Sequence, residues 1–241
     1  MLTLGKRADL EHSLQLGSAT LFSVEDIETG STAIFGLRSS FGRRGDQQLP
    51  KVLPDSRLFR QLRADLQDLL IDATGLASLL NDASAGYRPK LKGCKFHDTI
   101  LLLGYRLVYI SPLGGPRPTR RLENAVHLGL TAFLVTFLPR LDRRIADNPL
   151  LANLLRSAAQ EHFDDEQEKQ EVLLWILFIG VASIFKQSDD GWLLPKTTRT
   201  IHALGLHTWE DVGQTLAKFP WVNAIHNKAA QALWYRSIVL P

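Results

Sequence analysis

Val172-Leu-Leu-Trp-Ile-Leu-Phe-Ile-Gly-Val-Ala-Ser-Ile-Phe185 is the stretch that decides the fold, because it offers no polar side to water. A helix that is apolar around its whole circumference must be enclosed by other helices or lie in lipid. The run has fourteen residues, whereas a helix needs about 20 apolar residues to span a bilayer. We therefore expect a central helix buried among other helices, and no stable insertion into a membrane.

Acidic residues on both sides of this run fit that expectation. Asp189 and Asp190 follow it, and an acidic cluster between Glu161 and Glu171 precedes it. Such flanks suit a buried helix that reaches water at both ends. The cluster could also hold a metal or face a partner, but a solvated linker that places negative charge at the start of the next helix explains it more simply.

The composition is that of a globular chain of 241 residues, with 45% hydrophobic and 22% charged residues. The formal charge of +3 is scattered, which is weak support for a nucleic-acid surface. Cys94 is the single cysteine, so we expect no intramolecular disulfide and a buried or half-buried thiol in a reducing compartment. The first residues lack the apolar segment of a secretory signal, so we expect an intracellular protein.

The chain divides near Pro54. The first part is rich in Gly, Ser and Thr, and we interpret residues 1–54 as a flexible or partly docked N-terminal arm. One short strand or helix could dock at 20–24 and 32–35, but we expect the arm to be dispensable for folding. Residues 55–241 are expected to form one all-α domain.

Hydrophobic periodicity predicts a series of helices beyond this boundary. Asp55 or Ser56 is the candidate N-cap of the first, and Asn148, which proline follows, is that of a later one. Thr208 and Asp211 have the spacing of a capping box. The predicted helices cover about 56–80, 96–110, 119–138, 149–158, 172–185, 192–205, 208–219 and 222–234. This series predicts an all-α, multi-helix bundle-like domain around one buried central helix.

The helix expected at 119–138 carries one narrow polar row: Arg120, Asn124, His127 and Thr131. Their spacing of four, three and four places them on one side of the helix. Polar groups on an otherwise buried helix need internal partners or a ligand. A solvent-facing strip, a buried hydrogen-bond network and a ligand or partner site are the three interpretations, and these residues are the candidate site.

The sequence lacks the spacings of the common catalytic and nucleotide-binding motifs. The histidines form loose pairs only; His202 and His207 are poorly spaced for a metal on one helix. Two groups of arginines flank the helix with the polar row: Arg117, Arg120 and Arg121, and Arg140, Arg143 and Arg144. They could grip a phosphate or an acidic partner, although no aromatic residues interleave with them. We expect no enzyme, no cofactor and no metal site.

A resemblance to a known family rests on packing residues: Leu173-Leu-Trp-Ile-Leu-Phe-Ile-Gly180, Trp192 with Leu193 and Pro195, Ala203-Leu-Gly-Leu-His-Thr-Trp-Glu210, Trp221 and Leu233-Trp234. The pattern also includes the Arg-Leu-Glu-x-Ala stretch from Arg121 and the Phe137-Leu-Pro-Arg140 segment, and it covers about 95–236. It resembles the C-terminal part of the regulatory domain of fungal zinc-cluster transcription factors.

The resemblance implies a nuclear regulatory domain that acts through protein partners or a small effector. The family also carries an N-terminal cluster of six cysteines that holds two zinc ions, which a chain with Cys94 alone cannot build. We therefore expect the regulatory part without a zinc cluster, and no sequence-specific DNA binding by this chain alone. The alternatives are a small-molecule-binding protein or enzyme with a pocket between helices near His127, and a peripheral membrane protein that exposes the apolar run.

Overall fold

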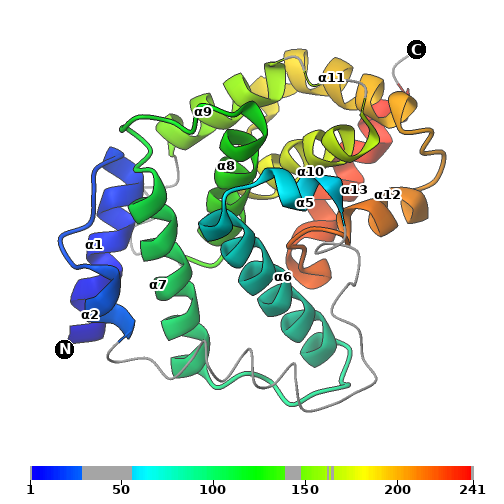
Figure 1. The fold of residues 1–241 in the computed structure, drawn as a ribbon. Coiled ribbons are helices and arrows are strands. Elements are labelled where there is room, and N and C mark those ends of the chain that lie inside the picture. The colour runs from blue at the N-terminus through cyan, green and yellow to red at the C-terminus, as the bar shows by residue number, and fades with distance from the viewer. Residues whose placement is uncertain (1, 29–55, 139–147, 162, 164–165, 240–241) are drawn as a thin grey trace.

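The chain is all-α within the residues that the computed structural model describes, namely 2–28, 56–138, 148–161, 163 and 166–239 (Figure 1). This confirms the predicted fold class. The α-helices are α1 Leu2–Leu16, α2 Val24–Glu28, α5 Arg57–Gln61, α6 Ala64–Ser84, α7 Gly93–Ile110, α8 Arg121–Val135, α9 Pro149–Gln160, α10 Gln167–Ser183, α11 Asp190–Ala203, α12 Trp209–Leu216 and α13 Asn223–Val239. A short 3-10 helix, Gln187–Asp189, precedes α11.

Helix α10 lies at the centre of the fold, as its apolar run predicts. Every side chain from Val172 to Ile179 is at most 2% exposed. Helices α8, α9, α11, α12 and α13 pack around it, and α5 lies over its first turns (Figure 1). Because burying one large apolar side chain stabilises the fold by about 1.5–3 kcal/mol, this helix contributes a large share of the hydrophobic free energy.

Helix α8 packs most extensively on α10, and it comes close at Gly129. A Cβ atom at this position would lie 2.5 Å from Cζ3 of Trp175, so only glycine leaves room for the ring. The ring also stacks on Phe219, with the ring centroids 5.2 Å apart. The indole N–H of Trp175 donates a hydrogen bond of 3.3 Å to the carbonyl oxygen of Pro220. Trp175 is therefore fully enclosed, and its polar atom has a partner.

The predicted caps are confirmed where they depend on neighbouring residues alone. The Asn148 side chain accepts the N–H of Leu151 at 2.9 Å at the start of α9. Thr208 Oγ1 accepts the N–H of Asp211 at 3.1 Å, and the Asp211 carboxylate accepts the N–H of Thr208 at 2.8 Å. Gly205 ends α11 with a φ of 63°, in the region that favours glycine.

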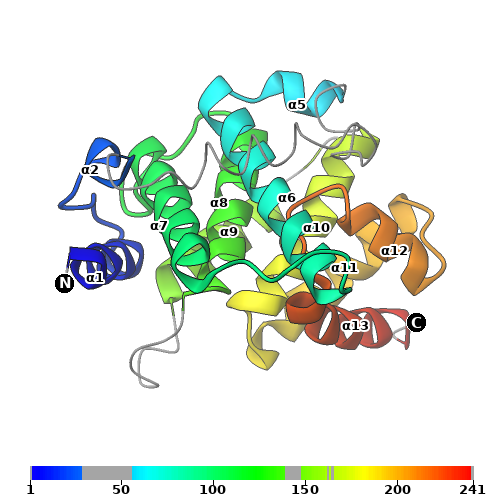
Figure 2. The ribbon, with the colours of Figure 1, turned by 90° about the horizontal axis from the view of Figure 1, so that it is seen from below.

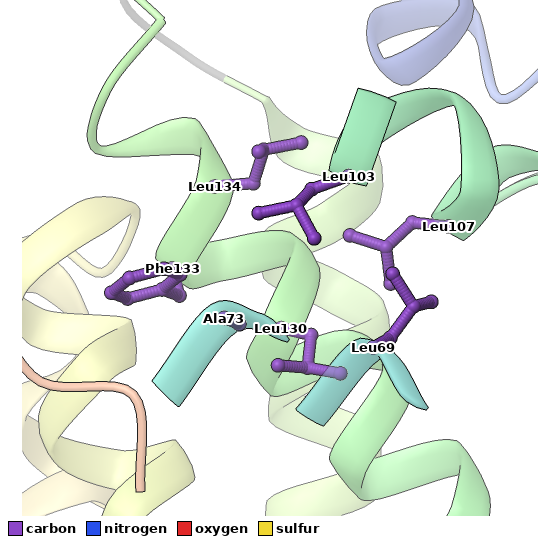
Figure 3. Close-up of a pocket in the computed structure, with 7 residues that line it drawn as sticks. All are labelled: Leu69, Ala73, Leu103, Leu107, Leu130, Phe133 and Leu134. Atoms are coloured by element: carbon purple, nitrogen blue, oxygen red, sulfur yellow. The ribbon is translucent and has the colours of Figure 1, made fainter. Parts of the chain in front are cut away.

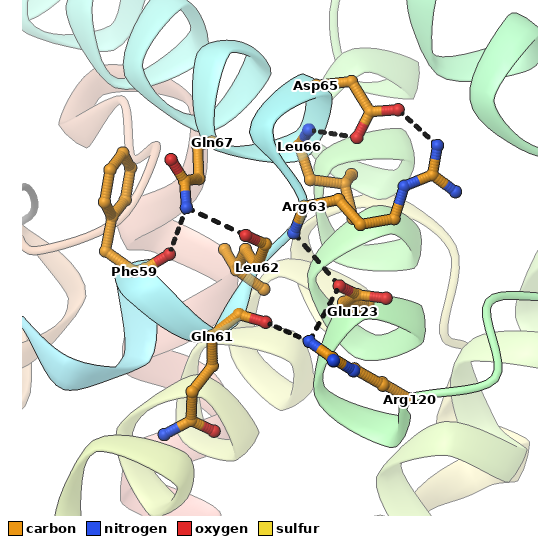
Figure 4. Close-up of polar contacts among 9 residues, drawn as sticks. All are labelled: Phe59, Gln61, Leu62, Arg63, Asp65, Leu66, Gln67, Arg120 and Glu123. Atoms are coloured by element: carbon orange, nitrogen blue, oxygen red, sulfur yellow. Dashed lines mark hydrogen bonds and ion pairs between the residues drawn. The ribbon is translucent and has the colours of Figure 1, made fainter.

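The single helix predicted from Asp55 or Ser56 to Leu80 is wrong, because the chain breaks between α5 and α6 (Figure 4). Ser56 does cap α5, since its Oγ accepts the N–H of Phe59 at 3.0 Å. Leu62 is extended, and the buried carboxylate of Glu123 on α8 accepts the N–H of Arg63 at 3.0 Å. A carboxylate from a distant helix thus caps α6 and favours the break over a continuous helix.

The N-terminal helices are more regular than the composition led us to expect. Helices α1 and α2 pack on α7 at the end of the molecule opposite α12 and α13 (Figures 1 and 2). Leu10 is fully buried, and a Cβ at Gly104 on α7 would lie 2.3 Å from its Cδ2. The hydroxyl of Tyr105 donates a hydrogen bond of 2.7 Å to Asp9.

These contacts argue against a wholly dispensable arm, because residues 2–28 bury side chains in the common core. Of the segments expected to dock, 20–24 belongs to the connection between α1 and α2 and ends at the first residue of α2. The segment 32–35 and the boundary at residue 54 lie outside the described residues.

Substitution of Gly129 by alanine tests the close approach of α8 to α10. Alanine favours a helix over glycine by about 1 kcal/mol, but a methyl group here meets a rigid indole ring. We expect G129A to lower the free energy of unfolding by about 1–3 kcal/mol in urea titrations, because overpacking dominates. The matched control is G213A on α12, where a Cβ meets nothing within 4 Å. It should raise stability slightly, and a stabilising G129A would contradict the packing described here.

Candidate functional site

The predicted polar row is organised by a residue outside it, Arg117, in the loop before α8. Its Nε donates to Oδ1 of Asn124 at 3.0 Å, and its Nη1 donates to Oγ of Ser111 at 3.1 Å. Its Nη2 lies 2.8 Å from Nδ1 of His127. The guanidinium thus fastens the loop between α7 and α8 to two residues of the row.

The contacts of His127 determine its protonation. Its Nε2 lies 2.9 Å from the carbonyl oxygen of Leu107, which can only accept. The proton is therefore on Nε2, and Nδ1 accepts from Arg117. The imidazole is 1% exposed, and burial lowers its pKa to about 4. Burial also lowers the pKa of Arg117 to about 10, so the guanidinium stays charged beside a neutral imidazole at neutral pH.

The other two members of the row have separate surroundings. Thr131 is buried, and its hydroxyl donates to the carbonyl oxygen of His127 at 2.9 Å. The Arg120 side chain is 70% exposed. Its Nη1 donates to the carbonyl oxygen of Gln61 at 3.1 Å and lies 3.8 Å from Oε1 of Glu123, at the break before α6 (Figure 4).

The row is therefore split between a buried hydrogen-bond network and a surface contact. Asn124 and His127 join α8 to Arg117 and to α7, Thr131 bonds within α8, and Arg120 supports the α5–α6 break. One sequence feature pointed to a special role for Arg117: it is the single residue between Pro116 and Pro118. Helical spacing could not reveal it, because it lies in a loop.

A small cavity lies between α6, α7 and α8, close to the row but not open to it (Figure 3). Apolar side chains alone line it: Leu69, Ala73, Leu103, Leu107, Leu130, Phe133 and Leu134. Its volume of about 10 Å³ is the space of about one water-sized probe. It offers a ligand neither room nor a polar contact.

The remaining candidates are scattered. Arg121 is exposed and lies 3.6 Å from the half-buried Glu161, and Arg140, Arg143 and Arg144 lie outside the described residues. His202 and His207 are exposed, and among the described residues no three His, Cys, Asp or Glu side chains gather as a metal site would need. Cys94 is exposed at the start of α7, not buried or half-buried as expected, because α7 begins at Gly93, three residues before the predicted start.

Helix α13 carries an exposed apolar face that the sequence analysis did not single out. Ile225, Tyr235 and Ile238 are 44%, 58% and 51% exposed, and Lys228 lies between them on the same face. The opposite face is buried in the core through residues such as Leu233 and Trp234. The sequence contained a sign of this face. Helix α13 has apolar residues on both sides, which is more than contact with the core on one side requires.

Comparison of the chain with family models, curated proteins and solved structures found no match. In the described part of the chain, no helix has both the length and the apolar character that crossing a membrane requires.

The buried imidazoles make stability depend on pH. Burial lowers the pKa of both His127 and His226 to about 4, against about 6.5 in the unfolded chain. Between these values the unfolded chain binds more protons, so stability falls as pH decreases from about 6.5. In urea titrations, H127Q should remove about 2 kcal/mol of the loss between pH 7 and pH 5. Exposed His202 provides the control H202Q, and an unchanged pH dependence in H127Q would show that His127 is not held neutral.

Proposed function

We propose that this chain is a nuclear regulatory domain of the type that its residues 95–236 resemble, that of fungal zinc-cluster transcription factors. It acts by binding a partner protein through the outer face of α13. The observation that carries the proposal is this face, with Ile225, Tyr235 and Ile238 exposed on one side of a helix whose other side is already buried. Large apolar side chains exposed along the outer side of one helix suit a protein-binding surface.

The chemistry of the face indicates the kind of partner. Tyrosine is enriched in protein interfaces because its ring buries apolar area while its hydroxyl stays hydrogen-bonded. Lys228 has no ion-pair partner among the residues that the structure describes. An amphipathic helix with apolar residues at helical spacing and an acidic residue opposite Lys228 would complement the face.

A specific observation bears on the alternative of a pocket between helices. A half-open cavity with charged and apolar lining lies between α5, α10 and the segment that follows α12, and none of its lining residues belongs to the row around His127. It supports a small effector as a second regulator of the same domain.

Tethering the chain to a reporter promoter through a heterologous DNA-binding domain tests the proposal. We expect altered transcription that I225E and Y235E each abolish, because a carboxylate on the apolar face opposes burial by the partner. The matched control is Y109E, since Tyr109 is 81% exposed on α7, outside this face. Equal reporter activity of all three variants, with expression and melting temperature unchanged, would refute the α13 surface.

The chain by itself should lack sequence-specific DNA affinity, because the base-reading module of the resembled family depends on zinc thiolates and this sequence has one cysteine. Its arginines should give weak binding that falls steeply as salt rises. A competition titration at near-physiological salt checks this. Tight binding to one duplex that excess random duplex cannot displace would contradict the prediction.

A further inference from the structure

A cavity of about 220 Å³, with both charged and apolar side chains in its lining, opens where three segments distant in the sequence meet. Ser56 and Leu58 come from the start of α5, Glu168 and Glu171 from the first turns of α10, and Lys218 and Phe219 from the turn that follows α12. Charged groups of both signs therefore line the cavity, together with apolar side chains.

The charged groups retain binding capacity. Glu171 is 6% exposed, and Gln167 Nε2 and Lys218 Nζ both donate to its Oε1, at 3.2 and 2.6 Å. Its Oε2 accepts no hydrogen bond from the described residues, although a carboxylate has about four acceptor sites. The Lys218 ammonium has three N–H donors, of which one is used within the described part of the chain.

The carboxylate of Glu168 has a different role. Its two oxygens accept the backbone N–H groups of Arg57 and Leu58, so it joins α10 to α5. Glu168 therefore adds negative charge to the cavity, but both of its oxygens already accept hydrogen bonds, whereas Oε2 of Glu171 accepts none from the described residues. The site thus presents an acceptor at Glu171, donors at Lys218, and apolar walls at Leu58 and Phe219, which are both at most 4% exposed.

We infer that this cavity binds a small zwitterion, a free α-amino acid with an apolar side chain. The ligand's ammonium group would donate to Glu171, its carboxylate would accept from Lys218, and its side chain would lie on Leu58 and Phe219. The cavity of about 220 Å³ lies below the range of about 300–1,000 Å³ for drug-sized ligands. This suits a ligand of about the size of leucine.

The position of Phe219 connects the cavity with the core. Phe219 stacks on Trp175, whose indole N–H donates to the carbonyl oxygen of Pro220. A ligand that packs on Phe219 alters the surroundings of this buried indole. Binding should therefore change the tryptophan fluorescence of the protein. The regulatory meaning of the site rests on the proposed function, but ligand binding itself does not.

Isothermal titration calorimetry with L-leucine tests the site directly. We expect a Kd of the order of 1 mM or below, as a small polar ligand with two ion-paired groups allows. Compounds that lack the carboxylate (3-methylbutylamine), the ammonium group (4-methylpentanoate) or the apolar side chain (glycine) should each bind at least about tenfold more weakly. Equal affinity for the amine would show a simple cation site and overturn the proposal, as would no heat with L-leucine.

Matched variants locate the binding. K218M keeps the aliphatic stem and should weaken L-leucine at least about tenfold, because the carboxylate loses its cation. The control K95M changes an exposed lysine of α7, outside the cavity and the α13 face, and should bind as the unchanged chain does. If K218M unfolds because it leaves Glu171 unpaired, the double variant E171Q/K218M removes both charges and should fold without binding. Undiminished binding to either folded variant would overturn the proposal.

Calorimetry and the reporter test different claims. L-leucine binding by a chain that is silent at the reporter would refute the partner surface and leave the ligand site standing. Reporter activity by a chain that does not bind L-leucine would refute the ligand site and leave the partner surface standing.

Discussion

The fold depends on a helix that has no polar face. From Val172 to Ile179 every side chain of α10 must be covered, so its neighbours have to supply apolar surface on all sides. One consequence is the pairing of Gly129 with Trp175, where α8 approaches so closely that no Cβ fits. Polar side chains are therefore excluded from the surroundings of α10 between Val172 and Ile179, and polar chemistry near this helix lies at its ends. The proposed ligand cavity lies at one such end, and the α13 face is on the outside.

Local features of the fold could be predicted from the sequence because neighbouring residues determine them. The apolar run identified α10, and the caps at Asn148 and Thr208 act within one helical turn. The break at Leu62 could not be predicted in this way, because its cause is Glu123, a carboxylate on another helix. The docking of α1 was missed for a similar reason, since the space for Leu10 is created by Gly104 on α7.

The candidate site shows the same limit of helical spacing. Spacing placed Asn124 and His127 on one side of α8 correctly, but it could not supply their partner Arg117, which a loop between two prolines brings to them. The contacts with Arg117 change the interpretation of Asn124 and His127 from a ligand site to an internal hydrogen-bond network. The cavity at Glu171 and Lys218 was beyond sequence reasoning, because its lining residues come from three separate segments with no shared spacing.

The two proposed surfaces meet in one short connection. Phe219 and Pro220 contact Trp175, and α13 begins three residues later, at Asn223. The connection is also fixed from α6, where the Asn81 side chain donates to the carbonyl oxygen of Trp221 and accepts the N–H of Asn223. A ligand can change partner binding only if it favours one of two arrangements, and the effect is reciprocal. Hydrogen bonds hold both ends of this connection. Within it, the ring of Phe219 is the part that a ligand in the cavity would contact directly. Coupling between the two sites therefore has to begin at Phe219.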